Sequence, residues 1–217
     1  MRDSIGRSGG HARRIRLFTV RTLREILRDP LSFVICLGVP LVLLVAMYAL
    51  FSPTEPWFSL DMLTPGIAVF SGAFAMLYMA LLVSRDRATW FLTRLYSSPL
   101  TDGDFVLGYA LPGILIGAGQ LAICWCSEVT ASMGRICAAP TAGSCGILPA
   151  VLSALPMVVC FVFIGILSGS LFSDKAAPGL SSVVISGAGF LSGAWMPVES
   201  LSGGFRTFCA WLPFYPA

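Results

Sequence analysis

The sequence has few of the residues on which soluble enzymes depend. Charged residues make up only 12% of it, and its single histidine, His11, lies in a basic tail that we expect to be disordered. It contains no glycine-rich phosphate loop, and its carboxylates are scattered among the predicted loops. Its seven cysteines show no spacing typical of a metal site. We therefore predict no enzymatic activity, no cofactor or metal held by this chain, and no nucleic-acid partner.

Apolar residues are what the sequence has in excess. They make up 56% of the 217 residues, against roughly 45–50% in soluble domains, and the mean hydropathy is +0.84. Such a chain needs lipid, which a helix of about 20 apolar residues can cross. We predict an all-α, polytopic membrane protein with one N-terminal interfacial helix and about five spans. The spans run over about 31–51, 65–84, 105–126, 148–172 and 179–195.

The predicted spans carry almost no polar chemistry. None has a charged residue at its centre, which argues against a proton relay or a cation path. The third span contains Gln120, the only uncharged amide side chain of the sequence. Gln120 is a candidate for a translocation path, and a helix-to-helix hydrogen bond explains it equally well. Gly-x-x-x-Gly spacings at 113–117 and 165–169 would let helix backbones approach closely.

The distribution of basic residues predicts the domain organisation and the orientation. Eight arginines precede Leu31, and residues 13–28 form a basic amphipathic pattern that Asp29-Pro30 ends. We therefore divide the chain into a cytoplasmic tail with an interfacial helix, 1–30, and a transmembrane domain, 31–217. The loop 85–104 is also rich in arginine, so the positive-inside rule places it on the cytoplasmic side with the N-terminus.

Three smaller features bear on the remaining segments. Thr64 is a plausible N-cap for the helix of the second span, with Pro65 at its first position. Cys137 and Cys145 share one polar loop, and they would form a disulfide only if that loop faces an oxidising compartment. The last segment, 196–217, is rich in aromatic residues and is typical of a membrane interface on the outer side.

The most informative segment runs from Arg85 to Leu100. It has a charged start, several aromatic residues and a proline stop, on the side predicted to be cytoplasmic. Such a mixture suits a docking element, in which apolar anchors fill a groove while arginines fix the orientation. A membrane-surface loop with arginines that reach toward the headgroups explains the same pattern, and residue chemistry alone leaves both open.

Particular motifs resemble the ATP-binding-cassette type 2 permease family. They are Thr64-Pro65-Gly66-Ile67, Arg85-Asp86-Arg87, Arg94-Leu95, Ser98-Pro99-Leu100 and Gly108, with Gly193–Pro197 and Leu212–Tyr215 in the tail. The resemblance covers roughly residues 15–217. It implies that the N-terminal helix is an elbow and that 85–100 is a coupling helix, which a cytoplasmic ATPase moves. The coupling residues it implies are Arg85, Asp86, Arg87, Trp90, Arg94, Leu95 and Pro99.

The resemblance also implies a function. The chain would be the permease subunit of an ATP-driven exporter in a bacterial plasma membrane, paired with a second permease copy and an ABC ATPase that binds ATP and Mg. Drugs, antibiotics, lipids and glycans all suit its apolar path.

Many relatives have Gly-Thr and an acid where this chain has Trp90, Phe91 and Thr93, which leaves the details of ATPase docking open. The family has a sixth helix that we expect to be missing here. The alternative is an ATPase-independent secondary transporter or channel.

Overall fold

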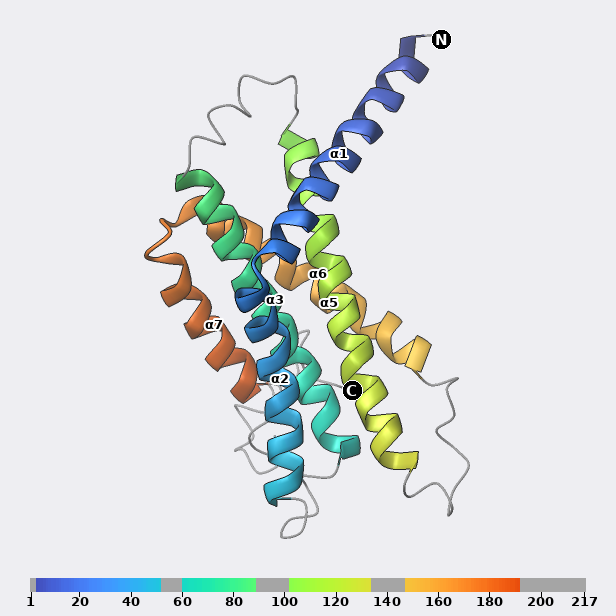
Figure 1. The fold of residues 1–217 in the computed structure, drawn as a ribbon, viewed down its shortest axis with the longest axis vertical. Helices are drawn as coiled ribbons and strands as arrows, with labels where there is room; N and C mark the ends of the chain where they lie inside the picture. Colours follow the sequence, from blue (N-terminus) through green and yellow to red (C-terminus); the bar gives the residue numbers. More distant parts are fainter. Residues whose placement is uncertain (1–2, 52–59, 89–101, 134–146, 192–217) are drawn as a thin grey trace, which may run out of the picture.

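The described part of the chain is entirely helical. A computed structural model describes residues 3–51, 60–88, 102–133 and 147–191, and within these ranges no strand occurs. The helices are α1 (Asp3–Arg28), α2 (Pro30–Phe51), α3 (Leu60–Ala88), α5 (Asp102–Met133), α6 (Ile147–Leu171) and α7 (Ala177–Leu191), as Figure 1 shows. The predicted all-α, polytopic membrane fold is confirmed.

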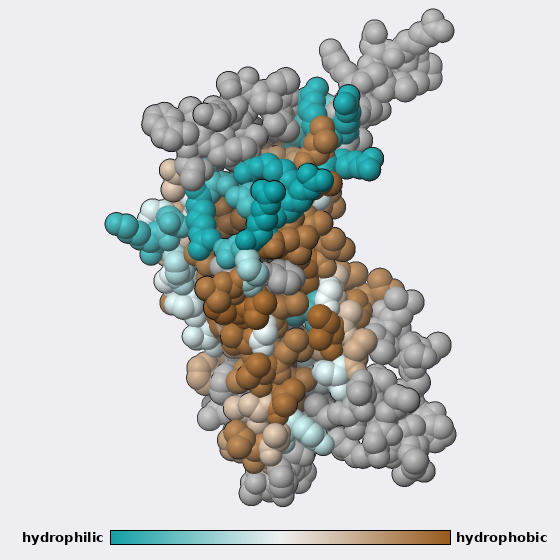
Figure 2. Space-filling view, in the orientation of Figure 1, coloured by the Kyte–Doolittle hydropathy of each residue, from teal (hydrophilic) through white to brown (hydrophobic). Residues whose placement is uncertain are grey.

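Four of these helices are long and apolar enough to cross a membrane. Their qualifying stretches are Val34–Phe51, Leu63–Ala88, Gly103–Ser127 and Val151–Leu171. α7 is apolar but only 15 residues long, and 192–195 lie outside the described residues. The fifth span expected at 179–195 therefore stays a prediction. Figure 2 shows hydrophilic residues gathered toward one end of the molecule and hydrophobic residues covering the surface below them.

Two helix boundaries differ from the sequence expectation. α1 begins at Asp3, so His11 belongs to a helix, and our expectation of a disordered tail was wrong there. α3 begins at Leu60, so Thr64 lies inside it and is not an N-cap. Pro65 is the sixth residue of α3, so it lies inside the helix and removes the backbone hydrogen bond that its N–H would otherwise donate to the carbonyl of Asp61. The predicted end of the first helix at Asp29-Pro30 is confirmed, since α1 stops at Arg28.

α3 is the central helix, since it packs against α2, α5, α6 and α7. Its contact with α6 is close because two glycines of α6 face its backbone. A Cβ atom added to Gly165 would lie 2.6 Å from the carbonyl oxygen of Met76, and one added to Gly169 would lie 2.6 Å from that of Ala80. The close backbone approach that the 165–169 spacing predicts is therefore present, and only glycine permits it.

α5 packs on the same core through a second close contact. A Cβ atom added to Gly117 would lie 2.4 Å from Cγ1 of Val158 on α6. α1 lies against α5 and extends beyond the other helices at one end of the bundle (Figure 1). The polar residues that point to function are concentrated where α1, α3 and α5 meet.

Candidate functional site

The end of α3 carries the triplet Arg85-Asp86-Arg87, with which the predicted coupling segment begins. Arg85 and Arg87 are exposed, whereas Asp86 is only 4% exposed. Successive side chains of a helix point in different directions, so only one of three neighbours can face the interior here. The other predicted coupling residues lie outside the described residues: Trp90, Arg94, Leu95 and Pro99.

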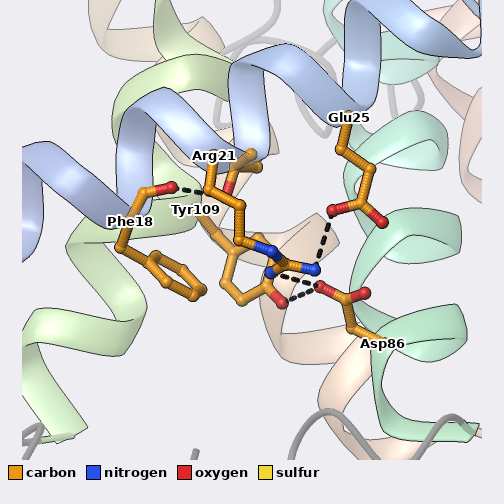
Figure 3. Close-up of polar contacts among 6 residues, drawn as sticks. Phe18, Arg21, Glu25, Asp86 and Tyr109 are labelled. Atoms are coloured by element: carbon orange, nitrogen blue, oxygen red, sulfur yellow. Dashed lines mark hydrogen bonds and ion pairs between the residues drawn. The ribbon is translucent and has the colours of Figure 1, made fainter.

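Asp86 is the point at which three helices meet. The hydroxyl of Tyr109 on α5 donates a hydrogen bond to Oδ2 of Asp86. Nη1 of Arg21 on α1 lies 3.5 Å from the same oxygen, an ion-pair distance. Figure 3 shows the guanidinium and the phenol hydroxyl both directed at one oxygen of this carboxylate. The buried charge is therefore compensated by one cation and one hydroxyl donor, as a buried carboxylate requires.

Arg21 is held by further contacts along its own helix. Its Nη2 atom lies 2.9 Å from Oε2 of Glu25, four residues later (Figure 3). Its guanidinium carbon lies 5.9 Å from the ring centroid of Phe18, within the range of a cation–π contact. The Arg21 side chain is 36% exposed, so solvent weakens each contact. Together these partners fix the direction in which the guanidinium points.

Aromatic rings support Tyr109 from two sides. The rings of Phe18 and Phe105 lie 5.0 and 4.9 Å from it, both edge to face. Phe18 lies directly over Gly108, because a Cβ atom there would be only 1.9 Å from Cδ1 of the Phe18 ring. Gly108 therefore provides the space that lets α1 lie close to α5. We name Phe18, Arg21, Asp86 and Tyr109 the α3-end cluster.

Glu25 lies beside this cluster, and its carboxyl group has a raised pKa. Partial burial raises the pKa of its carboxyl group above the usual 4.5, the nearby Asp86 carboxylate raises it further, and Arg21 opposes both effects. The side chain is 41% exposed, so the effect is moderated by water. Two carboxylates thus compete for the one guanidinium of Arg21, and Asp86 is the more deeply buried of them.

The exposed residues around Asp86 bind other elements. Nη1 of Arg85 lies 3.1 Å from Oδ2 of Asp29, between α1 and α2. Arg87 donates a hydrogen bond to the carbonyl of Ser170, at the end of α6. One turn earlier, the Ser84 hydroxyl lies 3.2 Å from Oδ1 of Asp174, in the turn between α6 and α7. The end of α3 is therefore connected to every other described helix or to a turn beside it.

His11 adds a further link between α1 and α5. Its Nδ1 atom lies 3.1 and 3.2 Å from the two carboxylate oxygens of Asp104, in the first turn of α5. Asp104 is buried, and His11 is partly exposed. Sequence reasoning missed this pair because the two residues are 93 positions apart.

Gln120 lies deep in the bundle, away from the cluster. It is fully buried, and its Nε2 atom donates a 3.3 Å hydrogen bond to the carbonyl of Cys36 on α2. This is the geometry of a helix-to-helix hydrogen bond, one of the two interpretations open at the sequence level. Its assignment to a translocation path stays a prediction.

The cluster is built to hold elements together. Among the residues that the structure describes, no group of three His, Cys, Asp or Glu side chains could hold a metal ion. Arg85, Asp86 and Arg87 were the coupling residues predicted from sequence within this part, and of these the structure brings Asp86 together with Arg21 and Tyr109. Sequence reasoning missed Arg21 and Tyr109. The only signal was Asp86 itself, an acid between two arginines at the end of an apolar span.

Comparison with known proteins gives one match. A family model described as ABC-2 type transporter matches residues 13–217. No curated protein and no solved structure matches the chain. The matched range covers all of the α3-end cluster.

Proposed function

Because the chain belongs to the ABC-2 type transporter family, we propose that it is the permease subunit of an ATP-driven exporter. Members of this family are membrane transport subunits. In our proposal a separate cytoplasmic ABC ATPase binds ATP and Mg, hydrolyses the ATP, and moves the segment that follows α3. The permease provides the path, and the ATPase provides the energy.

The observation that supports this proposal is the burial of Asp86 between α1 and α5. If an ATPase moves the segment that follows α3, the end of α3 must be firmly packed against its neighbours. Otherwise the displacement would only bend the chain locally. Asp86 is connected to α1 through Arg21 and to α5 through Tyr109. Arg87 connects the same turn to α6. A displacement applied beyond Ala88 would therefore move α1, α5 and α6 together with α3.

The proposed cycle follows from these connections. ATP-driven closure of two ATPase subunits pushes the segments 85–100 of two permease copies. The bundles then tilt, and a path opens between them for a drug, an antibiotic, a lipid or a glycan. We place the protein in a bacterial plasma membrane, as the resemblance implies. We place its N-terminus in the cytoplasm, because α1, which carries exposed arginines, is paired through Arg21 with the end of α3 that carries Arg85 and Arg87.

Co-purification with a candidate ABC ATPase, produced together with this chain, tests the partner. We expect the ATPase to associate with wild type and to be released by Arg87→Glu combined with Arg94→Glu, because these changes reverse the charge of the proposed docking surface. The matched control is Arg13→Glu combined with Arg16→Glu, the same change of charge at two exposed positions of α1. The control should keep the ATPase bound.

If wild type binds no ATPase, the exporter proposal fails, and the ATPase-independent secondary transporter or channel replaces it. Release by both double variants would mean that net charge, rather than the segment after α3, governs association. Release by the first double variant alone supports docking at this segment.

A second variant tests transmission separately from docking. Tyr109→Phe keeps the ring that packs against Phe18 and Phe105 but removes the hydrogen bond to Asp86. We expect the ATPase to remain bound while stimulation of its activity by transport substrate falls by about tenfold, the effect of one lost hydrogen bond to a charged group. Ser182→Ala, which removes an exposed hydroxyl bonded only within α7, is the control. Unchanged stimulation in Tyr109→Phe would contradict transmission through Asp86.

A further inference from the structure

Two adjoining cavities lie where α1, α2 and α3 meet. The first has a volume of about 170 Å³ and is lined by Glu25, Asp29, Tyr78, Leu81, Leu82 and Arg85. The second has a volume of about 140 Å³ and is lined by Ile35, Cys36, Phe74, Leu77, Tyr78 and Leu81. They share Tyr78 and Leu81, so they adjoin each other along α3, and we treat the pair as one site. We name it the α2–α3 groove.

The groove changes from polar to apolar along its length. Its polar end carries two carboxylates and one guanidinium, from Glu25, Asp29 and Arg85. Its other end is lined by Ile35, Phe74 and other apolar side chains, and the Cys36 thiol there already donates to the carbonyl of Phe74. From Arg85 to Phe74 the groove follows about 16 Å of α3, at 1.5 Å per residue.

This direction agrees with the placement of the helices in a membrane. The candidate spans begin at Val34 on α2 and end at Ala88 on α3, so the polar end lies at the edge of the apolar layer. The apolar end lies within the spans of both helices. A lipid has the same arrangement, because its polar headgroup lies at the membrane surface and its acyl chain lies in the apolar layer.

We propose that the α2–α3 groove binds a bilayer phospholipid with a primary-amine headgroup, its ammonium at Glu25 and Asp29, its phosphate at Arg85 and an acyl chain along Phe74. Asp29 is paired with Arg85, and Glu25 shares Arg21 with Asp86, so three carboxylates face two guanidinium groups here. A zwitterionic headgroup adds a cation to this group together with a phosphate for Arg85, whereas an anionic headgroup without an amine adds only negative charge. A primary ammonium can donate three hydrogen bonds to these carboxylates. The position of Glu25, partly buried beside Asp86, makes an added cation favourable there.

The chemistry also separates this lipid from choline lipids. A quaternary ammonium donates no hydrogen bond, and proteins recognise it by surrounding it with aromatic rings. Tyr78 is the one aromatic residue among the described residues that line the polar end. The inference goes beyond the proposed export function, because retention of this lipid requires neither ATP nor an ATPase.

Native mass spectrometry of the purified full chain tests the inference. The delipidated protein is titrated with phosphatidylethanolamine, phosphatidylglycerol or phosphatidylcholine of identical acyl chains, and the bound fraction is measured. We expect phosphatidylethanolamine to be retained about tenfold more tightly than either of the others, the effect of one charge-assisted hydrogen bond. Equal retention of the three lipids by wild type would overturn the proposal. Preference for phosphatidylglycerol would also overturn it, because the arginines of α1 would then select the headgroup.

Two variants locate the binding site. Glu25→Gln combined with Asp29→Asn should lower retention of phosphatidylethanolamine about tenfold and leave phosphatidylcholine unchanged. Leu81→Trp, at the point shared by both cavities, should lower retention of phosphatidylethanolamine by blocking the groove. Asp174→Asn, an exposed acid in the turn between α6 and α7, is the control and should retain the lipid like wild type.

Unchanged preference in the double variant would overturn the proposal. The wild-type comparison of three lipids requires no substitution, so it remains decisive if a variant does not fold. Lipid retention that disappears when the chain dimerises would assign the groove to a second copy of the chain, and would likewise overturn the proposal.

Discussion

α2 and α3 are both apolar helices, but their surroundings are opposite. Of the stretch Val34–Phe51 of α2, 17% is buried inside the protein, against 78% of the stretch Leu63–Ala88 of α3. The less buried helix is the more hydrophobic of the two. Hydropathy therefore indicates that a helix lies in lipid, but it does not indicate how deeply that helix lies within the bundle.

Small residues and polar ends account for the difference. Lipid tails are as apolar as leucine, so an apolar surface gains little by leaving lipid for a protein interior. α3 is buried because glycines of α6 admit its backbone and because its last turn binds three neighbours. Along α2, side chains such as Val42 and Val45 stay exposed, and Gly38 has no neighbour close to the position of a Cβ atom.

Alanine substitutions at glycines should show the largest contrast between the two helices. Gly165→Ala places a methyl group 2.6 Å from a backbone oxygen of α3, which cannot move without shifting the helix. We expect it to destabilise the protein by about 3 kcal/mol, at the upper end of the usual cost of overpacking. Gly38→Ala on α2 meets nothing within 4 Å and should stabilise the protein by up to about 1 kcal/mol, because alanine favours helix.

Thermal unfolding of the purified chain in detergent measures both effects. Opposite signs for the two substitutions would support the contrast between a packed and a lipid-facing helix. A loss of stability in Gly38→Ala comparable to that in Gly165→Ala would mean that α2 is covered by another chain in the sample, and the contrast would then hold for the isolated chain only.

The polar end of α3 should give an intermediate effect. Asp86→Asn keeps the shape and an acceptor for Tyr109 but removes the charge that faces Arg21. We expect a loss of about 1–2 kcal/mol, less than for a fully buried pair because Arg21 is partly exposed and keeps Glu25 as a partner. Asp174→Asn changes an exposed acid and keeps an acceptor oxygen for the Ser84 hydroxyl, so it should stay within about 0.5 kcal/mol of wild type. Denaturant unfolding of both variants makes the comparison, and equal losses would refute a special role for Asp86.

The contrast also shows what sequence could predict. The helices, the end of α1 at Asp29-Pro30 and the close approach at Gly165 and Gly169 follow from local patterns, and the structure contains them. The triplet at the end of α3 was identified through a family resemblance. The partners of Asp86 could not be predicted, because Arg21 and Tyr109 are 65 and 23 positions away. Nothing in periodicity or composition indicates which of many arginines turns inward.

The smallest effect concerns Glu25, close to the junction of α1 with α2 and beside the end of α3. The pKa of its carboxyl group is raised above the usual 4.5, so folding favours the protonated form. Its stabilising contribution is full below the unfolded pKa and is lost as pH rises through the raised folded pKa. Glu25→Gln removes this titration. We therefore expect the variant to equal or slightly exceed wild type in stability at about pH 8, and the difference to move in favour of wild type as the pH falls to about 4.

The melting temperatures of wild type and Glu25→Gln, measured across this pH range, show whether the attraction of Arg21 or the combined effect of burial and Asp86 dominates at Glu25. If the variant is less stable at the alkaline end and the deficit shrinks with acid, the attraction of Arg21 exceeds burial and the repulsion from Asp86. If the variant is more stable than wild type at the alkaline end, burial and the repulsion from Asp86 exceed the attraction of Arg21. The charged Glu25 carboxylate then destabilises the folded protein. An additional cation beside Glu25 would then be stabilising, and the proposed binding of a lipid ammonium at the polar end of the α2–α3 groove depends on this.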